Sequence, residues 1–205
     1  MRFFGGWEFD TTYAQSRLPG DIGYAKGVPM GDDLSDSPQA GAAPNFLIAA
    51  LKDPYSGNLE RIQVVKGWLD ANGETQERVF GVVWSGDRKP GEDGKLPDVG
   101  NTADAGTSTF SNSIRAPELI SVWTDPEFDP NQSAFFFARV LEIPTPCWSV
   151  YFAVQFGDEI PEDVPVFILL RKKGRSGPRC VSLRSLGKVS RWSKLPVQNW
   201  RNASS

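Results

Sequence analysis

The sequence contains no histidine, and this absence excludes more chemistry than any other feature. Histidine is the commonest general base and the commonest transition-metal ligand, so neither a Ser-His-Asp triad nor a Cys-His pair can form within this one chain. Cysteine is almost as scarce, because only Cys147 and Cys180 occur. Two cysteines provide neither a disulfide framework nor a four-ligand structural zinc site. We therefore expect no catalytic residue, no metal ligand set and no cofactor in this chain.

Long apolar runs are also missing. The longest, such as residues 133–138, are far shorter than the roughly 18 residues of a membrane helix. The first residues, Met1–Trp7, predict a strand and lack the long apolar run of an export signal. We predict no membrane span and no signal peptide, and the compartment remains unknown.

Acidic groups are absent from one end of the chain. Ten of the 22 Lys and Arg residues fall in residues 171–205, which contain no Asp or Glu, so the first 170 residues carry 12 basic and 25 acidic groups. Such asymmetry can mark an acidic domain with a basic arm that binds nucleic acid, or a tail that is foreign to the domain.

What the sequence does contain is a series of aromatic and β-branched segments separated by turns, which predicts a mainly β protein with little helix. The clearest signal is the pair 61–69 and 76–84, which flank an Asn-Gly step at Asn72-Gly73 as the strands of a hairpin do. The other predicted strands are Phe3–Phe9, Phe46–Leu51, Leu119–Trp123, Ala134–Leu141 and Trp148–Phe156. Together they predict an antiparallel sheet or a two-layer sandwich with long loops.

Two long polar segments interrupt these strands. Residues 15–43 are predicted to be a loop that can line a site, and residues 85–117 to be a surface excursion. Four of the seven tryptophans lie within or beside predicted strands, so we expect them in the core rather than on a carbohydrate-binding platform. These are Trp68, Trp84, Trp123 and Trp148.

Carboxylates are the remaining chemical resource, and they gather in two loops. The two groups are Asp32, Asp33 and Asp36, and Asp125, Glu127 and Asp129. A hard cation such as calcium takes six to eight oxygen ligands, so either group could contribute to a site. However, acidic loops commonly solvate a surface, and Asp before Pro initiates turns. We interpret both groups as surface loops.

Five segments in a fixed order carry a family resemblance. They are Arg2–Trp7, Tyr24–Gly31, Arg61–Trp68, Trp123–Pro130 and Ala134–Glu142. With Pro144–Pro146 and Trp148-Ser149 in the right order, residues 2–168 resemble the bacterial family catalogued as domain of unknown function 3604 (DUF3604). Its members look like metallohydrolases of the polymerase-and-histidinol-phosphatase type.

The resemblance implies that these segments form the C-terminal end of longer proteins, with the metal motifs upstream. The chain would then be the non-catalytic, truncated C-terminal part of a metal-dependent hydrolase, inactive alone. Its parent would hold a divalent metal and would often be exported or periplasmic, and its partner would be the missing upstream barrel. Separated from that barrel, the chain is expected to self-associate through an exposed apolar face. The alternatives are a free-standing β-rich module that binds a ligand or protein, and nucleic-acid contact through the basic tail, although no binding module accompanies that tail.

The resemblance assigns one loop of this chain as a candidate pocket rim. It assigns no metal ligand to this chain. The rim consists of Tyr24, Lys26, Met30, Asp32 and Asp33. Asp32 stands where the family usually shows a second glycine, so the loop here is expected to differ in conformation from the family's loop. Cys147 also departs from the family, because arginine is usual before Trp148.

The chain ending departs further. Family members tend to end with a Gln-Glu-Arg-Ala-Trp run, and codons for Gln-Glu-Arg-Ala read one base later can encode Lys-Lys-Gly-Arg, the string at residues 172–175. We therefore expect two parts, a β-rich domain over 1–168 and a basic tail over 169–205 that is frameshifted, disordered or irregular.

Overall fold

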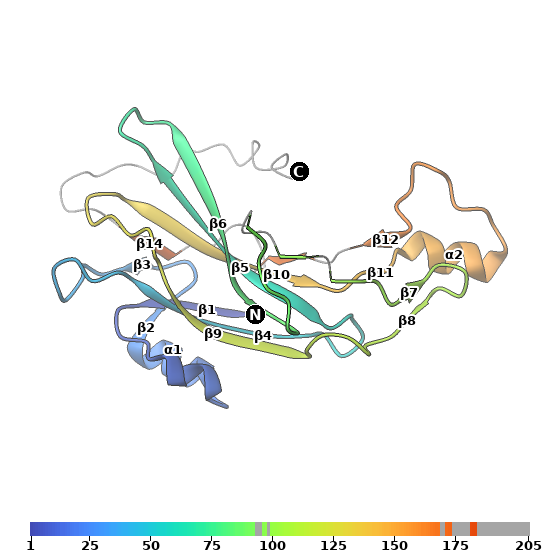
Figure 1. Ribbon diagram of the computed structural model, residues 1–205, viewed down its shortest axis with the longest axis horizontal. Coiled ribbons are helices and arrows are strands. Elements are labelled where there is room, and N and C mark those ends of the chain that lie inside the picture. Colours follow the sequence, from blue (N-terminus) through green and yellow to red (C-terminus); the bar gives the residue numbers. More distant parts are fainter. Residues whose placement is uncertain (93–95, 98, 169–170, 174–180, 184–205) are drawn as a thin grey trace.

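The computed structural model describes residues 1–92, 96–97, 99–168, 171–173 and 181–183. Within them, two mainly antiparallel sheets pack face to face as a β-sandwich (Figure 1). The prediction of a mainly β, sandwich-like protein is therefore confirmed. No helix among these residues is long and apolar enough to cross a membrane.

The first sheet has the strand order β2-β1-β4-β9. Its strands are β1 (Arg2–Gly6), β2 (Gly27–Pro29), β4 (Asn45–Leu51) and β9 (Glu118–Thr124). The register places Phe4 opposite Leu47 and Leu47 opposite Val122, so these three residues share one face. Their neighbours Phe3 and Phe46 therefore point to the other face, toward the second sheet.

The second sheet has the order β3-β14-β10-β5-β6, and β13 also pairs with β10. Its strands are β3 (Asp33–Leu34), β5 (Leu59–Leu69), β6 (Thr75–Trp84), β10 (Ala134–Glu142), β13 (Arg171–Lys173) and β14 (Val181–Leu183). The predicted hairpin is confirmed as β5–β6, and Gly73 in its turn has a φ of 83°. β13 and β14 fall in the predicted tail, and the remainder of 169–205 lies outside the described residues.

Aromatic rings from both sheets meet at the centre of the sandwich. The Phe46 ring lies 4.6 Å from that of Phe136 and 5.3 Å from that of Phe3. Trp123 contacts Phe46 at 5.7 Å and Phe80 at 5.1 Å. Phe46 and Phe136 are fully buried, so this aromatic cluster holds the two layers together.

The segment 15–43 is not the loop that its composition predicts. It contains the helix α1 (Pro19–Lys26), preceded by the 3-10 helix η1 (Thr11–Gln15), and these elements cover the outer face of the first sheet (Figure 1). Two glycines, Gly20 and Gly23, allow α1 to lie close to the sheet. A Cβ atom at Gly23 would stand 2.3 Å from the Phe4 ring, so tertiary packing decides the helix despite its poor propensity.

The predicted strand at residues 148–156 is also wrong, because it forms the helix α2 (Trp148–Phe156). The helix ends at Gly157, whose φ of 72° is the left-handed conformation that terminates many helices. A pair of short strands, β11 (Thr145–Pro146) and β12 (Phe167–Ile168), joins the chain at the base of α2. Together they form an arm at one end of the sandwich (Figure 1).

In the described residues of the predicted surface excursion 85–117, namely 85–92, 96–97 and 99–117, the one hairpin is small and is made by β7 (Ala103–Asp104) and β8 (Thr109–Phe110). Asn58, just before β5, holds residues 112–115 of the excursion through hydrogen bonds. The Asn58 side-chain amide donates to the backbone oxygens of Asn112, Ile114 and Arg115 at 2.9–3.1 Å. The described part of the excursion is thus anchored at its C-terminal end.

Candidate functional site

The structure divides the predicted pocket rim between the two sides of the first sheet. Tyr24 lies on α1 and contacts the Phe4 ring edge-on at 4.9 Å, while the Lys26 ammonium lies 5.8 Å from the Tyr13 ring. Met30, by contrast, packs against the core between the sheets. Asp32 and Asp33 follow on the surface. Whether these five residues hold a ligand remains a prediction.

The substitution at Asp32 does not disturb the rim backbone. Gly31 takes the positive φ, 112°, and the Asp32 amide donates to the Pro29 oxygen at 3.2 Å, which closes a turn. The preceding glycine therefore supplies the special conformation, and the acidic side chain at position 32 is accommodated without strain.

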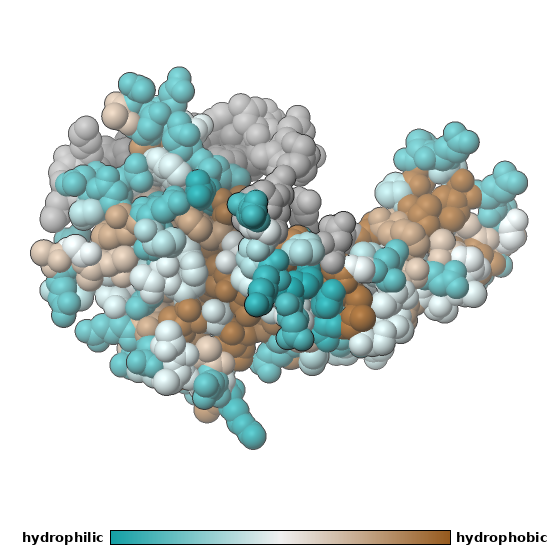
Figure 2. All heavy atoms as spheres, in the orientation of Figure 1, coloured by the Kyte–Doolittle hydropathy of each residue, from teal (hydrophilic) through white to brown (hydrophobic). Residues whose placement is uncertain are grey.

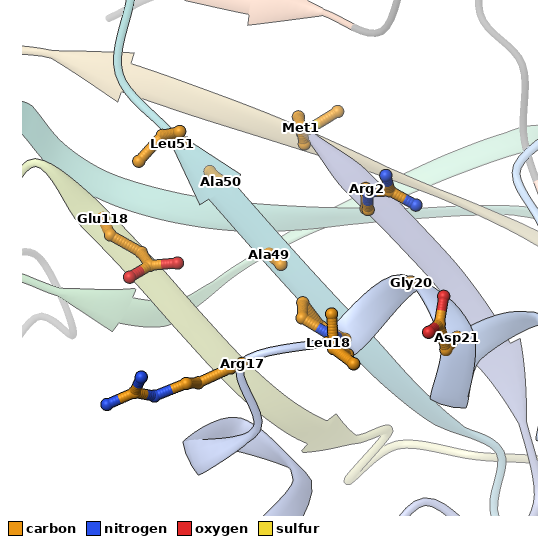
Figure 3. Close-up of a pocket in the computed structure, with 11 residues that line it drawn as sticks. Met1, Arg2, Arg17, Leu18, Gly20, Asp21, Ala49, Ala50, Leu51 and Glu118 are labelled. Atoms are coloured by element: carbon orange, nitrogen blue, oxygen red, sulfur yellow. The ribbon is translucent and has the colours of Figure 1, made fainter.

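A pocket of about 280 Å³ lies elsewhere, on the outer face of the first sheet beside the start of α1 (Figure 3). Its charged lining residues are Arg2, Arg17, Asp21 and Glu118. In Figure 3, Arg2 and Asp21 lie at one side of the pocket, and Arg17 and Glu118 at the other. Because the two signs balance, the pocket has no marked preference for an anion or a cation.

Two buried charges form an ion pair that links the two sheets. Lys66 on β5 places its Nζ 2.7 Å from Asp125 Oδ2, and their side chains are 3% and 0% exposed. Lys66 also donates to the Glu127 backbone oxygen at 2.6 Å, and the Glu127 amide donates to Asp125 Oδ1 at 2.9 Å. The ammonium lies over the rings of Trp68 and Phe136. Both Asp125 oxygens and two of the three Lys66 donors are thus engaged inside the protein, which indicates a structural role for the pair.

Two further buried carboxylates also have partners. Glu60 accepts from Arg88 Nη1 and Arg61 Nε, each at 2.7 Å. Glu142 accepts from the Ser56 hydroxyl. These contacts tie β5 to the excursion and β10 to the turn before β5.

The acidic group at 125–129 does not converge on one point. Asp125 binds Lys66, Glu127 forms an exposed ion pair with Arg78 at 3.2 Å, and Asp129 accepts from the Asn131 amide at 2.9 Å. Among the residues that the structure describes, no three His, Cys, Asp or Glu side chains are placed to share a metal ion.

Among the described residues, Asp10, Asp70 and Cys147 have pKa values below their ordinary values because of neighbouring polar groups. The backbone N–H of Glu74 is the main reason that the pKa of Asp70, in the β5–β6 turn, lies below 3.8. The side-chain and backbone groups of Ser149 lower the pKa of the buried Cys147 thiol below 9.0 at the start of α2.

Among the described residues, α2 carries an exposed aromatic face. Trp148, Phe152 and Phe156 are 69%, 53% and 64% exposed and follow each other at one-turn intervals. Figure 2 shows this apolar surface over the arm. The prediction that Trp148 belongs to the core is therefore wrong, whereas Trp68 and Trp123 do pack against the core.

The DUF3604 family model, described as a protein of unknown function, matches residues 1–172. The chain belongs to the DUF3604 family. Comparisons with curated proteins and with solved structures each found no match.

The segments that suggested DUF3604 from the sequence are those that build the sandwich. Arg2–Trp7 contains β1, Arg61–Trp68 lies within β5, and Ala134–Glu142 is β10. Trp123–Pro130 supplies both the central Trp123 and Asp125, the partner of Lys66. The segments that resemble DUF3604 in this chain therefore contain residues that build the strands and the core of the sandwich.

Sequence reasoning missed the buried charges of the DUF3604 chain, although one signal was present. Lys66 stands in phase with the inward-facing residues Ile62 and Val64 of β5, where an apolar residue is expected. A charge at such a position requires a buried partner, but nothing in the sequence says that Asp125, 59 residues away, provides it.

Proposed function

We propose that this chain is a non-catalytic accessory β-sandwich of a metal-dependent hydrolase, inactive by itself. The supporting observation is that, among the described residues, the buried carboxylates Glu60 and Asp125 are held in ion pairs and Glu142 accepts a hydrogen bond from Ser56. The chain also contains no histidine. A carboxylate that is already paired and inaccessible is a poor general base or metal ligand.

The first test is direct assay of the purified chain with phosphate monoester and diester substrates in the presence of Mg²⁺, Mn²⁺ or Zn²⁺. The expected result is no turnover above that of the metal alone, together with no stoichiometric metal binding by calorimetry. Metal-dependent turnover that disappears in the variants Asp32→Asn or Asp33→Asn would overturn the proposal and assign chemistry to the candidate rim.

The second test concerns the larger protein. We propose that the metal motifs and the partner barrel are encoded upstream, and that residues from about Leu169 onward are a frameshifted translation. Sequencing the genomic DNA on both sides of the reading frame tests both ideas. Histidine-rich motifs upstream and the family ending in a shifted frame downstream support them, and the absence of either contradicts the corresponding idea.

A second candidate function is a free-standing protein-binding module, favoured by the exposed aromatic face of α2. A complete gene whose product is stable and binds a partner supports this candidate over the accessory domain. The nucleic-acid alternative depends on the basic tail 169–205, most of which lies outside the described residues, and it predicts binding that weakens steeply with salt.

A further inference from the structure

Helix α2 presents an uncharged, symmetric aromatic face. Trp148 and Phe152 have ring centroids 5.7 Å apart, and Phe152 and Phe156 have centroids 5.9 Å apart. The helix is anchored through its other side, where Val150 and Ala153 are buried. None of its nine residues is charged. The face is therefore built into a defined helix and is not a loose end of the chain.

We propose that this face is a dimer interface that pairs α2 with α2 of a second copy of the chain, in antiparallel orientation about a two-fold axis. This inference does not depend on the proposed function. It rests on the symmetry of the face, on its area and on the charges that follow the helix.

The symmetry of the face suits an antiparallel pair. Phe152 lies midway between Trp148 and Phe156, four residues from each. With the axis at Phe152, the two Phe152 rings meet each other, and Trp148 of each copy meets Phe156 of the other. A two-fold interface must be self-complementary in this way.

The area is sufficient for a weak dimer. Trp148, Tyr151, Phe152 and Phe156 are between 42% and 69% exposed, and with 150–250 Å² for each whole aromatic side chain they offer about 450 Å² per copy. Two copies would bury about 900 Å², close to the ~1,000 Å² of a small specific interface. Interfaces of this size are typically weak, and area alone does not set affinity, so a dissociation constant on the order of 10 µM is taken as the working value for the test.

The charges decide the orientation. The loop after α2 carries four carboxylates, Asp158, Glu159, Glu162 and Asp163, and residues 144–166 contain no Lys or Arg. A parallel pair would bring these carboxylates together. In an antiparallel pair, the loop of each copy approaches the helix N-terminus of the other, where the backbone dipole favours negative charge. The same carboxylates disfavour an anionic membrane as the occupant of the face.

Sedimentation velocity of the full chain from 1 to 100 times the expected dissociation constant tests the proposal. A monomer–dimer equilibrium is expected, and Phe152→Glu should weaken it at least tenfold, because it places two carboxylates at the axis. Tyr55→Glu is the matched control, since Tyr55 is an aromatic residue that is 94% exposed and lies in the turn between β4 and β5. Circular dichroism must show that both variants keep the fold.

Cross-linking separates this dimer from nonspecific association. In a Cys180→Ser background, Phe152→Cys should form a disulfide-linked dimer on mild oxidation, whereas Tyr55→Cys should not. A chain that is monomeric at all concentrations, or an association that Phe152→Glu leaves unchanged, overturns the proposal. Association only with anionic vesicles also overturns it and assigns the face to a membrane surface.

Discussion

Removing one member of the buried pair Lys66–Asp125 should be among the most destabilising changes to the sandwich. Lys66→Met leaves the Asp125 carboxylate 0% exposed, with the Glu127 amide at 2.9 Å as its remaining hydrogen bond. Loss of one partner from a buried ion pair costs about 3–5 kcal/mol of unfolding free energy. Because domains are stable by about 5–15 kcal/mol, Lys66→Met should remove a large share of the total.

The double variant Lys66→Met/Asp125→Leu provides the decisive comparison. With both charges gone, no uncompensated charge is buried, so we expect a loss of only about 0–2 kcal/mol, far less than the sum of the two single variants. Urea unfolding followed by tryptophan fluorescence measures each value, because Trp68 lies beside the pair.

The exposed pair Arg78–Glu127 serves as the control for this cycle. Its atoms lie 3.2 Å apart, but the side chains are 59% and 44% exposed, so Arg78→Met should cost less than about 1 kcal/mol. Equal losses for Lys66→Met and Arg78→Met, or strict additivity in the Lys66–Asp125 double variant, would refute the reasoning from burial.

Three further predictions concern the rest of the described structure. Gly67→Ala should destabilise the sandwich by about 1–3 kcal/mol in thermal melts, because a Cβ atom there would stand 2.2 Å from the Phe135 ring. Gly81→Ala is the control, since a Cβ atom there would meet nothing nearer than 3.9 Å, and it should be neutral or stabilising. A carboxyl NMR titration should find the pKa of Asp70 below 3.8. The carboxylate then stabilises the fold above that pH, and this contribution is lost as the pH falls through the folded-state pKa. A normal pKa for Asp70 would contradict the role of its turn hydrogen bonds. Asn58→Ala should lower the free energy of unfolding by about 1–3 kcal/mol and increase amide hydrogen exchange at residues 112–116, because backbone oxygens there lose their donor. Unchanged exchange would mean that other contacts hold the excursion.

Most strands could be predicted because their signals are local. The apolar run of β4 between two prolines and the hairpin β5–β6 with its Asn-Gly turn carry their structure in a few adjacent residues. Both helices were missed for opposite reasons. α1 contains Pro19, Gly20 and Gly23, which indicate a loop until the surface that it covers is known. α2 is rich in aromatic residues that favour strands, and between Ser149 and Gln155 it has no strongly polar residue to reveal a helical period.

The candidate site was less predictable than the fold, because its determinants are long-range. The sequence places Tyr24, Lys26 and Met30 within seven residues, yet α1 and β2 direct them to different sides of the first sheet. Lys66 and Asp125 are distant in sequence and adjacent in space. Only the pairing of the two sheets determines such contacts, and no local pattern encodes it.

The central position of Phe46 has a consequence for synthesis of the protein. Phe46 packs against Phe3 from the first strand and against Phe136 from β10, so its environment joins residues that are made at very different times. During translation, β1 and β4 leave the ribosome before the strands of the second sheet, and the contact between Phe46 and Phe136 can form only after β10 has followed. Such non-local topology folds slowly and exposes apolar surface while it waits. We therefore expect chaperones that bind exposed aromatic segments to bind this chain during its synthesis.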